Sequence, residues 1–241
     1  MSHTQEAAHG EDEIDGADDR GRRWYDDRAL AGRAITGDRA RELLGPVMGF
    51  VAVTLGFSAL GAYLGRDLEG GAGIAFFVGA FACVIGLIVA AAKGREQLAI
   101  GLLFGLGLLL GLAVAPVIAD YANADPSTLW QAAGGTAAFV AACGAYGYAT
   151  RRDLSSWART LFWALLGLIA FGIVAIFVSI PNGQIIYAVA GLAIFGGFTI
   201  YDFNRLRRAS PDGAVVIAVS IYLDIFNVFL LALSLFGSGR D

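Results

Sequence analysis

Seven long apolar runs limit what this chain can fold into more than any other feature of its 241 residues. A helix needs about 20 apolar residues to cross the hydrocarbon core of a bilayer, and each run is close to this length. The runs cover residues 43–64, 73–92, 97–119, 129–149, 157–180, 184–201 and 214–236. The pattern predicts an all-α membrane protein, built as a bundle of seven transmembrane helices.

Lysine and arginine fall almost entirely on one side of this predicted bundle. If the helices alternate in direction, 15 of the 17 basic residues lie on the side of the N-terminus, and only Arg66 and Arg240 lie on the other. Basic residues mark the cytoplasmic loops of membrane proteins. We therefore predict a multi-pass protein of the cell inner membrane, with a cytoplasmic N-terminus and a C-terminus outside.

The segment before the first run differs sharply from the rest. Residues 1–42 hold 11 of the 21 acidic and 7 of the 17 basic residues, so the whole net charge of −4 belongs to them. Such a segment cannot bury enough apolar surface to offset the entropy of ordering. We predict a disordered acidic cytoplasmic tail over 1–42 and a transmembrane domain over 43–241. His3 and His9 lie in this tail and are expected to be solvated.

Prolines and glycines refine the helix bounds and contacts. Pro116 is expected to kink or stop the third helix. The connection at 181–183 is either a turn between two helices or a break inside one, and the length of 157–201 favours two helices. Four-residue spacings between Gly101 and Gly105, and between Gly107 and Gly111, predict close helix packing.

Asp224 is the one acidic residue inside these runs. A carboxylate near the middle of a spanning helix costs about 3 kcal/mol on insertion scales, so its presence indicates a function. Ser220, Asn227 and Ser234 share its helical stripe, which suggests that they line the same polar surface. The alternative is a polar stripe that only holds helices together.

Asp202 is the second candidate and ends the sixth run. Taken alone, an aspartate beside Arg205, Arg207 and Arg208 is usually a solvated ion pair. However, the sixth and seventh helices are joined by a short connection and should be antiparallel neighbours. Asp224 would lie about 15 Å deep, so the two carboxylates meet if the sixth helix tilts or its end dips inward.

A pair of this kind has two possible uses. Two carboxylates in a low-dielectric site cannot both ionise easily, so the pair can hold a proton. Their hard oxygen atoms also suit Ca²⁺, provided that carbonyls or waters complete its 6–8 ligands.

Three sequence stretches resemble one known family. They are SIYLDIFNVFLLAL at 220–233, TIYDFNRLR at 199–207 and AYGYATRRDLSSWART at 145–160. All three are similar to motifs of the Bax inhibitor-1 family, also called the transmembrane BAX inhibitor motif family. The resemblance implies seven spans, a cytoplasmic N-terminus and a pH-sensitive calcium leak. It also implies that Asp202 and Asp224 form a hydrogen-bonded pair that gates the path.

The second predicted helix departs from the family pattern. Related proteins often carry ionisable residues there, whereas residues 73–92 contain none. A closing latch would then have to be formed differently, with Arg205 or Arg207 as candidates.

Several functions remain open on the sequence. The leading hypothesis is a Ca²⁺ or cation leak channel gated by the aspartate pair, with Ser220 and Asn227 in support. A proton-coupled transporter would use the same residues, and a non-transporting scaffold would use them as structural contacts. An intramembrane aspartyl protease is disfavoured because Asp224 lacks the Gly-x-Gly-Asp context, so we expect no enzyme. No cofactor or nucleic-acid partner is expected; the partners are the lipid bilayer, Ca²⁺ and protons.

Overall fold

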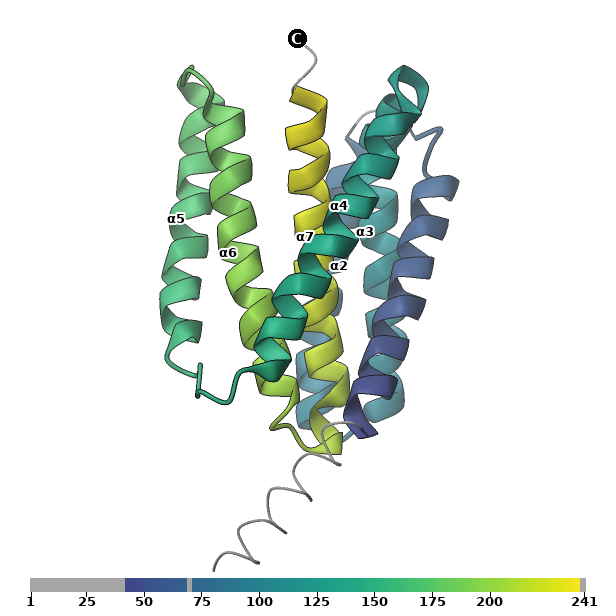
Figure 1. Cartoon of the computed structure of the whole chain (residues 1–241). Coiled ribbons are helices and arrows are strands. Elements are labelled where there is room, and N and C mark those ends of the chain that lie inside the picture. Colours follow the sequence, from purple (N-terminus) through teal and green to yellow (C-terminus); the bar gives the residue numbers. More distant parts are fainter. Residues whose placement is uncertain (1–41, 69–70, 239–241) are drawn as a thin grey trace, which may run out of the picture.

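The chain forms a bundle of seven long helices (Figure 1). The computed structural model describes residues 42–68 and 71–238, and these contain no strand. The helices are Glu42–Leu64, here called the first helix, α2 Ala72–Ala92, α3 Glu96–Ala124, α4 Pro126–Ala149, α5 Trp157–Phe177, α6 Gly183–Leu206 and α7 Ala214–Ser238. A short 3₁₀ turn, η1 Pro211–Gly213, precedes α7. The predicted all-α, seven-helix fold is confirmed, while the tail predicted over 1–42 lies almost wholly outside the described residues.

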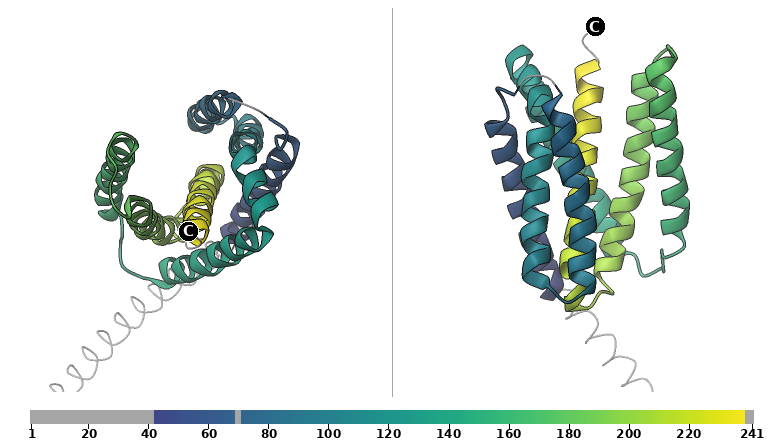
Figure 2. Two further views of the ribbon diagram at one scale, coloured as in Figure 1. Left: turned by 90° about the horizontal axis from the view of Figure 1, so that it is seen from above. Right: turned by 180° about the vertical axis from the view of Figure 1, so that it is seen from behind.

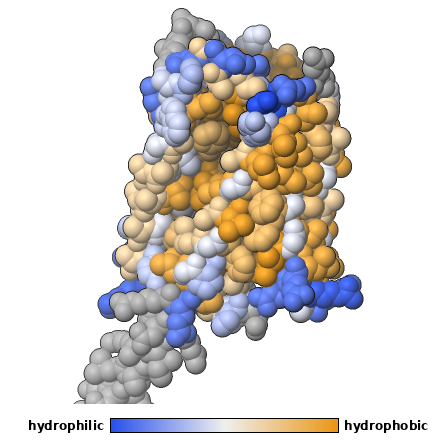
Figure 3. Space-filling model, turned by 90° about the vertical axis from the view of Figure 1, so that its right-hand side faces the viewer, coloured by the Kyte–Doolittle hydropathy of each residue, from blue (hydrophilic) through white to orange (hydrophobic). Residues whose placement is uncertain are grey.

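The surface of the bundle suits a bilayer. Six of the seven helices are long and apolar enough to span a membrane. Figure 3 shows an apolar band between two hydrophilic ends. The exception, α4, has a lower hydropathy because small and polar residues take the place of large apolar ones along much of its length. Its 24 residues still reach about 36 Å, which is enough to cross the hydrocarbon core.

The structure decides two helix bounds that the sequence left open. α3 does not stop at Pro116 but continues to Ala124, so the expected stop is wrong. Proline is tolerated within transmembrane helices because neighbouring groups satisfy the freed carbonyl. By contrast, the connection near 181–183 is a true turn, since α5 ends at Phe177 and α6 begins at Gly183.

α7 lies at the centre of the bundle. It packs against α6 and α4, and also contacts α3 and α2. The view from above in Figure 2 shows the other helices arranged around it. α5 is the outermost helix and packs against α6, so nearly all of its side chains are available to lipid. Central placement explains why α7 is more deeply buried than the other candidate spans.

Glycines allow the closest helix contacts. At Gly107 and Gly111 of α3, a Cβ would collide with the backbone of Thr54 and Ser58 in the first helix. The predicted packing role therefore applies to this pair. It does not apply to Gly101, where a Cβ would meet no atom within 4 Å. A similar contact joins Gly147, near the C-terminal end of α4, to the Ile200 carbonyl of α6.

Replacing Gly147 with alanine should destabilise the protein. The new Cβ would strike the Ile200 carbonyl oxygen, and forcing extra volume into a packed interface costs about 1–3 kcal/mol. The free energy of unfolding in detergent micelles measures the change. Gly134→Ala is the matched control in the same helix, because its Cβ would meet nothing within 4 Å. Equal effects of the two substitutions would contradict this account of the α4–α6 contact.

Candidate functional site

Asp224 lies near the middle of α7, where the surrounding helices exclude solvent. Its side chain is only 5% exposed. The Oδ2 atom is buried and has no hydrogen-bond partner among the described residues. An unpaired carboxylate oxygen at this depth is costly, so the group needs a proton, a cation or water to be stable.

Asp202 is buried as well, at 4% exposure. The solvated ion pair that is typical of such a sequence position is therefore not what the structure shows. The reason is that α6 continues to Leu206, one turn beyond the apolar run. Phe203, Asn204 and Leu206 are all buried, which draws this end of the helix into the bundle.

The packing of α6 on α7 brings the two aspartates together. Their carboxyl groups are close enough to repel each other when both are charged. Thr199, one turn before Asp202 on α6, is also fully buried and interacts with Asp224. The Thr199 hydroxyl donates to the Phe195 carbonyl at 2.9 Å. Two buried carboxylates in this arrangement are suited to sharing one proton.

The other predicted site residues differ in what they contact. Ser220 donates to the Val216 carbonyl at 3.2 Å, and Asn227 donates to the Leu223 carbonyl at 2.7 Å. Both bonds stay within α7, so these side chains flank Asp224 by one turn without bonding to it. Ser234, which was predicted to share the helical stripe of Asp224, accepts a hydrogen bond from the Gln184 side chain of α6 at 3.1 Å.

The two candidate latch arginines, Arg205 and Arg207, have different contacts. Arg205 is exposed and attracts the Asp202 carboxyl electrostatically. Arg207 instead reaches the Tyr148 carbonyl of α4 at 3.5 Å, which is a long contact. Of the two, only Arg205 is placed to influence the pair.

A polar clamp joins the C-terminal end of α6 to the α4–α5 connection. We define this clamp as Asn204, Arg208 and Asp153. The Asn204 amide nitrogen, on a residue only 2% exposed, contacts the carbonyls of Gly147, Thr150 and Arg152 at 3.0–3.3 Å. These contacts supply partners for carbonyls at and just after the end of α4, where backbone carbonyls lose their helical partners.

Arg208 completes the clamp. Its guanidinium lies 2.7 Å from Asp153 and donates to the Arg152 carbonyl at 2.8 Å. It also donates to the Asn204 side-chain oxygen. Hydrogen bonds from the Ser155 hydroxyl and backbone, followed by the Arg208 contact, lower the pKa of Asp153 to about 2. Asp153 is therefore charged throughout the physiological range.

A hydrogen bond also joins the first helix to α7, two residues before Asp224. The Tyr222 hydroxyl, on a fully buried side chain, lies 2.8 Å from the Ser58 hydroxyl. Thr199, Tyr222 and the clamp residues were not singled out from the sequence. One signal was available, since Asn204 lies within the same TIYDFNRLR stretch as Asp202 and has a side chain that prefers backbone partners.

The family is shown by comparison with known proteins. A family model described as an inhibitor of apoptosis-promoting Bax1 matches residues 40–241. The chain belongs to the Bax inhibitor-1 family. The predicted resemblance is thereby confirmed over the whole transmembrane domain.

Relatives from this family occur in bacteria and in a virus. A Helicobacter pylori protein of unassigned function is 30% identical over 169 residues, which cover 69% of this chain and 73% of that protein. The inner membrane protein YbhL of Escherichia coli K12 is 28% identical over 182 residues, covering 68% and 76%. The Golgi anti-apoptotic protein of vaccinia virus strain Lister is 36% identical over 154 residues, covering 63% and 64%.

Family membership and the apolar helices together give the localisation. The chain is a multi-pass protein of the inner membrane, as predicted. The direction in which it crosses stays a prediction.

Among the described residues, two acidic side chains meet at this site, Asp202 and Asp224. Within residues 42–68 and 71–238, no group of three or more His, Cys, Asp or Glu side chains is arranged to hold a metal ion. Ca²⁺ takes 6–8 oxygen ligands, so Asp202 and Asp224 would need carbonyls or waters to complete its shell.

Asn204→Ala should loosen the C-terminal end of α6. Removing the amide takes away the side-chain partner of the Gly147 and Thr150 carbonyls, at a cost of about 1–3 kcal/mol. Hydrogen exchange of the backbone amides over 150–156 should become faster. Asn227→Ala is the matched control, because that side chain bonds only within its own helix. No difference in exchange between the two variants would show that the clamp does not hold this connection.

Asp153→Asn tests the ionic half of the clamp and its pH dependence. An aspartate whose folded pKa is depressed to about 2 adds stability above its ordinary value of 3.8, and this is lost only as pH falls toward 2. The substitution should therefore lower Tm by the same amount at pH 5 and at pH 8. Asp120→Asn, at an exposed site on α3, should leave Tm unchanged. A loss that grows or vanishes between pH 5 and 8 would mean that another group controls the clamp.

Proposed function

We propose that this Bax inhibitor-1 family protein is a leak pathway for Ca²⁺ whose opening depends on protonation of Asp202 and Asp224. The observation that carries the proposal is the meeting of two buried carboxylates on adjacent helices. Neither group is explained by folding alone, because apolar residues at both positions would avoid the cost of burying a charge.

The pair can act as a gate because its proton content sets the force between α6 and α7. With one shared proton, the carboxyls attract each other through a hydrogen bond. With both ionised, they repel and draw in water or a cation. α7 packs against most of the other helices, so a change at this contact reaches much of the bundle.

A polar cavity supports access to the pair from one end. It has a volume of about 320 Å³ and lies at the connection between α6 and α7. Tyr201 and Arg205, which flank Asp202 on α6, belong to its lining. A proton or a hydrated cation entering here needs to move only past the last turn of α6 to reach Asp202.

Calcium is the favoured ion because carboxylates are the hard oxygen ligands that it prefers. A site with two such groups binds weakly enough to release the ion. Conduction requires this balance between entry and exit. The same residues would also serve an exchanger that moves protons against Ca²⁺, so the test must follow both ions.

Ca²⁺ and proton flux should be followed in liposomes that contain the purified protein, from pH 6 to pH 8. We expect a Ca²⁺ flux that varies with pH in the native protein. Asp202→Asn and Asp224→Asn should each remove most of that variation, because asparagine cannot exchange a proton. Coupled proton movement at a fixed ratio would indicate an exchanger instead.

Asp120→Asn is the control, since it makes the same chemical change at an exposed carboxyl on α3. Its flux should follow the native pH profile. Native protein that is folded but gives no flux above that of empty liposomes would overturn the proposal and favour a scaffold function. Flux that keeps its pH profile in both aspartate variants would remove the pair from the gate.

A further inference from the structure

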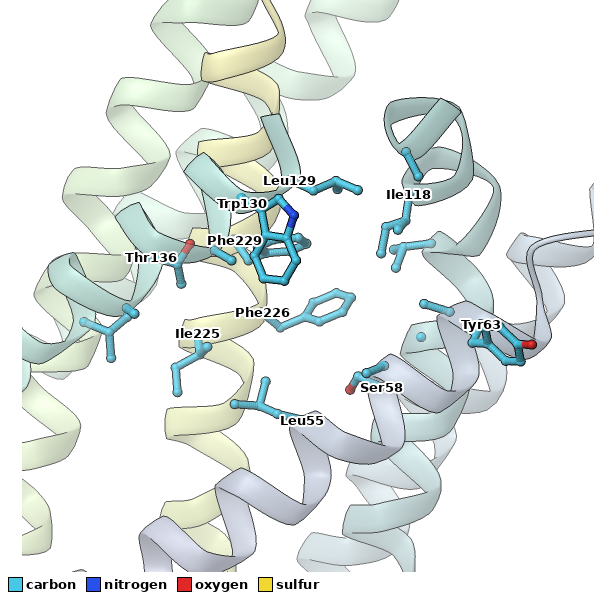
Figure 4. Close-up of a pocket in the computed structure, with 18 of the residues that line it drawn as sticks. Leu55, Ser58, Tyr63, Ile118, Leu129, Trp130, Thr136, Ile225, Phe226 and Phe229 are labelled. Carbon is cyan, nitrogen blue, oxygen red and sulfur yellow. The ribbon is translucent and has the colours of Figure 1, made fainter. Parts of the chain in front are cut away.

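A large apolar cavity lies between the first helix, α3, α4 and α7, and Phe203 of α6 also belongs to its lining. Its volume is about 1180 Å³, and neither Asp202 nor Asp224 lines it. Figure 4 shows Ser58 and Tyr63 on one side of this space, Leu129 and Trp130 on another, and Phe226 and Phe229 behind it. The cavity exceeds the usual range for small-molecule pockets, about 300–1,000 Å³.

The cavity is placed for contact with lipid. Its lining extends along the first helix from Leu44 to Tyr63, which corresponds to roughly 28 Å at the α-helical rise. This is close to the hydrocarbon thickness of a bilayer, about 30 Å. Figure 3 shows a hollow in the side of the bundle, within the apolar band and below one hydrophilic end. A lateral opening at this level faces acyl chains.

The lining suits an apolar chain and not an ion. Within the membrane depth it offers mainly alanine, leucine and aromatic surfaces, together with the hydroxyls of Ser58 and Thr136. Ser58 is already bonded to Tyr222 and to the Thr54 carbonyl. A cation crossing here would meet far fewer oxygen ligands than it requires.

Charged and polar groups gather at one end of the cavity, where Arg66, Asp67 and Asn123 belong to the lining. The Arg66 guanidinium stacks over the Tyr63 ring at 4.5 Å. It is also paired with Asp67 through a long contact of 3.4 Å, and both side chains are more than half exposed. Such a weak, exposed pair can open to bind other groups.

This end matches the charges of a zwitterionic phospholipid. Arginine binds phosphate through paired hydrogen bonds, while the carboxylate of Asp67 can bind a headgroup ammonium. Trp130 lines the cavity one turn into α4 and is 79% exposed. Tryptophan is enriched where a bilayer meets water, which places this end of the cavity at headgroup level.

We propose that the cavity binds a phospholipid from the leaflet on the Arg66 side, with acyl chains between the first helix and α4. The phosphate contacts Arg66 and the headgroup ammonium contacts Asp67. Phosphatidylethanolamine has both charges and is the probe of choice. Neither aspartate lines this site, and the proposal does not depend on the proposed leak.

Native mass spectrometry of delipidated protein in detergent, titrated with dioleoyl phosphatidylethanolamine, tests the proposal. Ala137 is exposed and lines the cavity, so Ala137→Trp should fill the space and weaken binding by about tenfold or more. Ala170→Trp is the matched control, because Ala170 is equally exposed on the outermost helix, α5. It should bind lipid as the native protein does.

Arg66→Gln and a lipid without phosphate test the headgroup contact. Arg66→Gln should also weaken binding of phosphatidylethanolamine, and dioleoyl glycerol should bind the native protein poorly. Equal binding by the Ala137→Trp variant and the native protein would overturn the proposal. So would equal binding of dioleoyl glycerol and phosphatidylethanolamine with no effect of Arg66→Gln, since the cavity would then accept any apolar chain.

Discussion

The contact between α6 and α7 at two buried carboxylates is the constraint on which the rest of the structure depends. A charge at this depth is costly. Thr199 beside Asp224 and Arg205 near Asp202 reduce that cost, whereas the closeness of the two carboxyl groups increases it when both are charged. The structure nevertheless keeps both groups together at this contact. This requires α7 to occupy the centre of the bundle and the C-terminal end of α6 to be buried in it. α4 meets both requirements, because its small residues allow it to pack closely against both helices.

The C-terminal end of α6 has two sets of polar contacts, the clamp and the aspartate pair. The clamp of Asn204, Arg208 and Asp153 holds the helix to the α4–α5 connection through backbone carbonyls and one ion pair. Since Asp153 stays ionised across the physiological range, these contacts do not change with pH there. In the proposed gate, the clamp would hold the end of α6 in place while the protonation of the aspartate pair changes.

The two cavities divide the bundle by chemistry. The polar cavity lies at the α6–α7 connection, next to the residues that flank Asp202, whereas the apolar cavity lies between the first helix and α4. A lipid held in the apolar cavity would lie against Phe226 and Phe229 of α7. The central helix would therefore contact both the aspartate pair and a component of the bilayer, since Phe226 lies only two residues from Asp224.

Much of this protein was determined by the sequence alone, because the bilayer sets the length of each apolar run. The number of helices, most of their bounds and the exceptional position of Asp224 follow from that length and from the cost of charge in hydrocarbon. The Bax inhibitor-1 family was also recognisable from three short stretches. The continuation of α3 beyond Pro116 was not, since neighbouring helices decide whether a proline ends a transmembrane helix.

Only the tertiary structure decided that Asp202 is buried. In sequence it stands beside three arginines, and nothing local distinguishes it from a solvated ion pair. Its burial results from the packing of Phe203, Asn204 and Leu206, and from the Gly147 contact that lets α4 approach α6. The clamp and the apolar cavity arise in the same way, because they join residues that are far apart in sequence. Hydropathy along the chain reports how each helix meets lipid, whereas these features depend on how the helices meet one another.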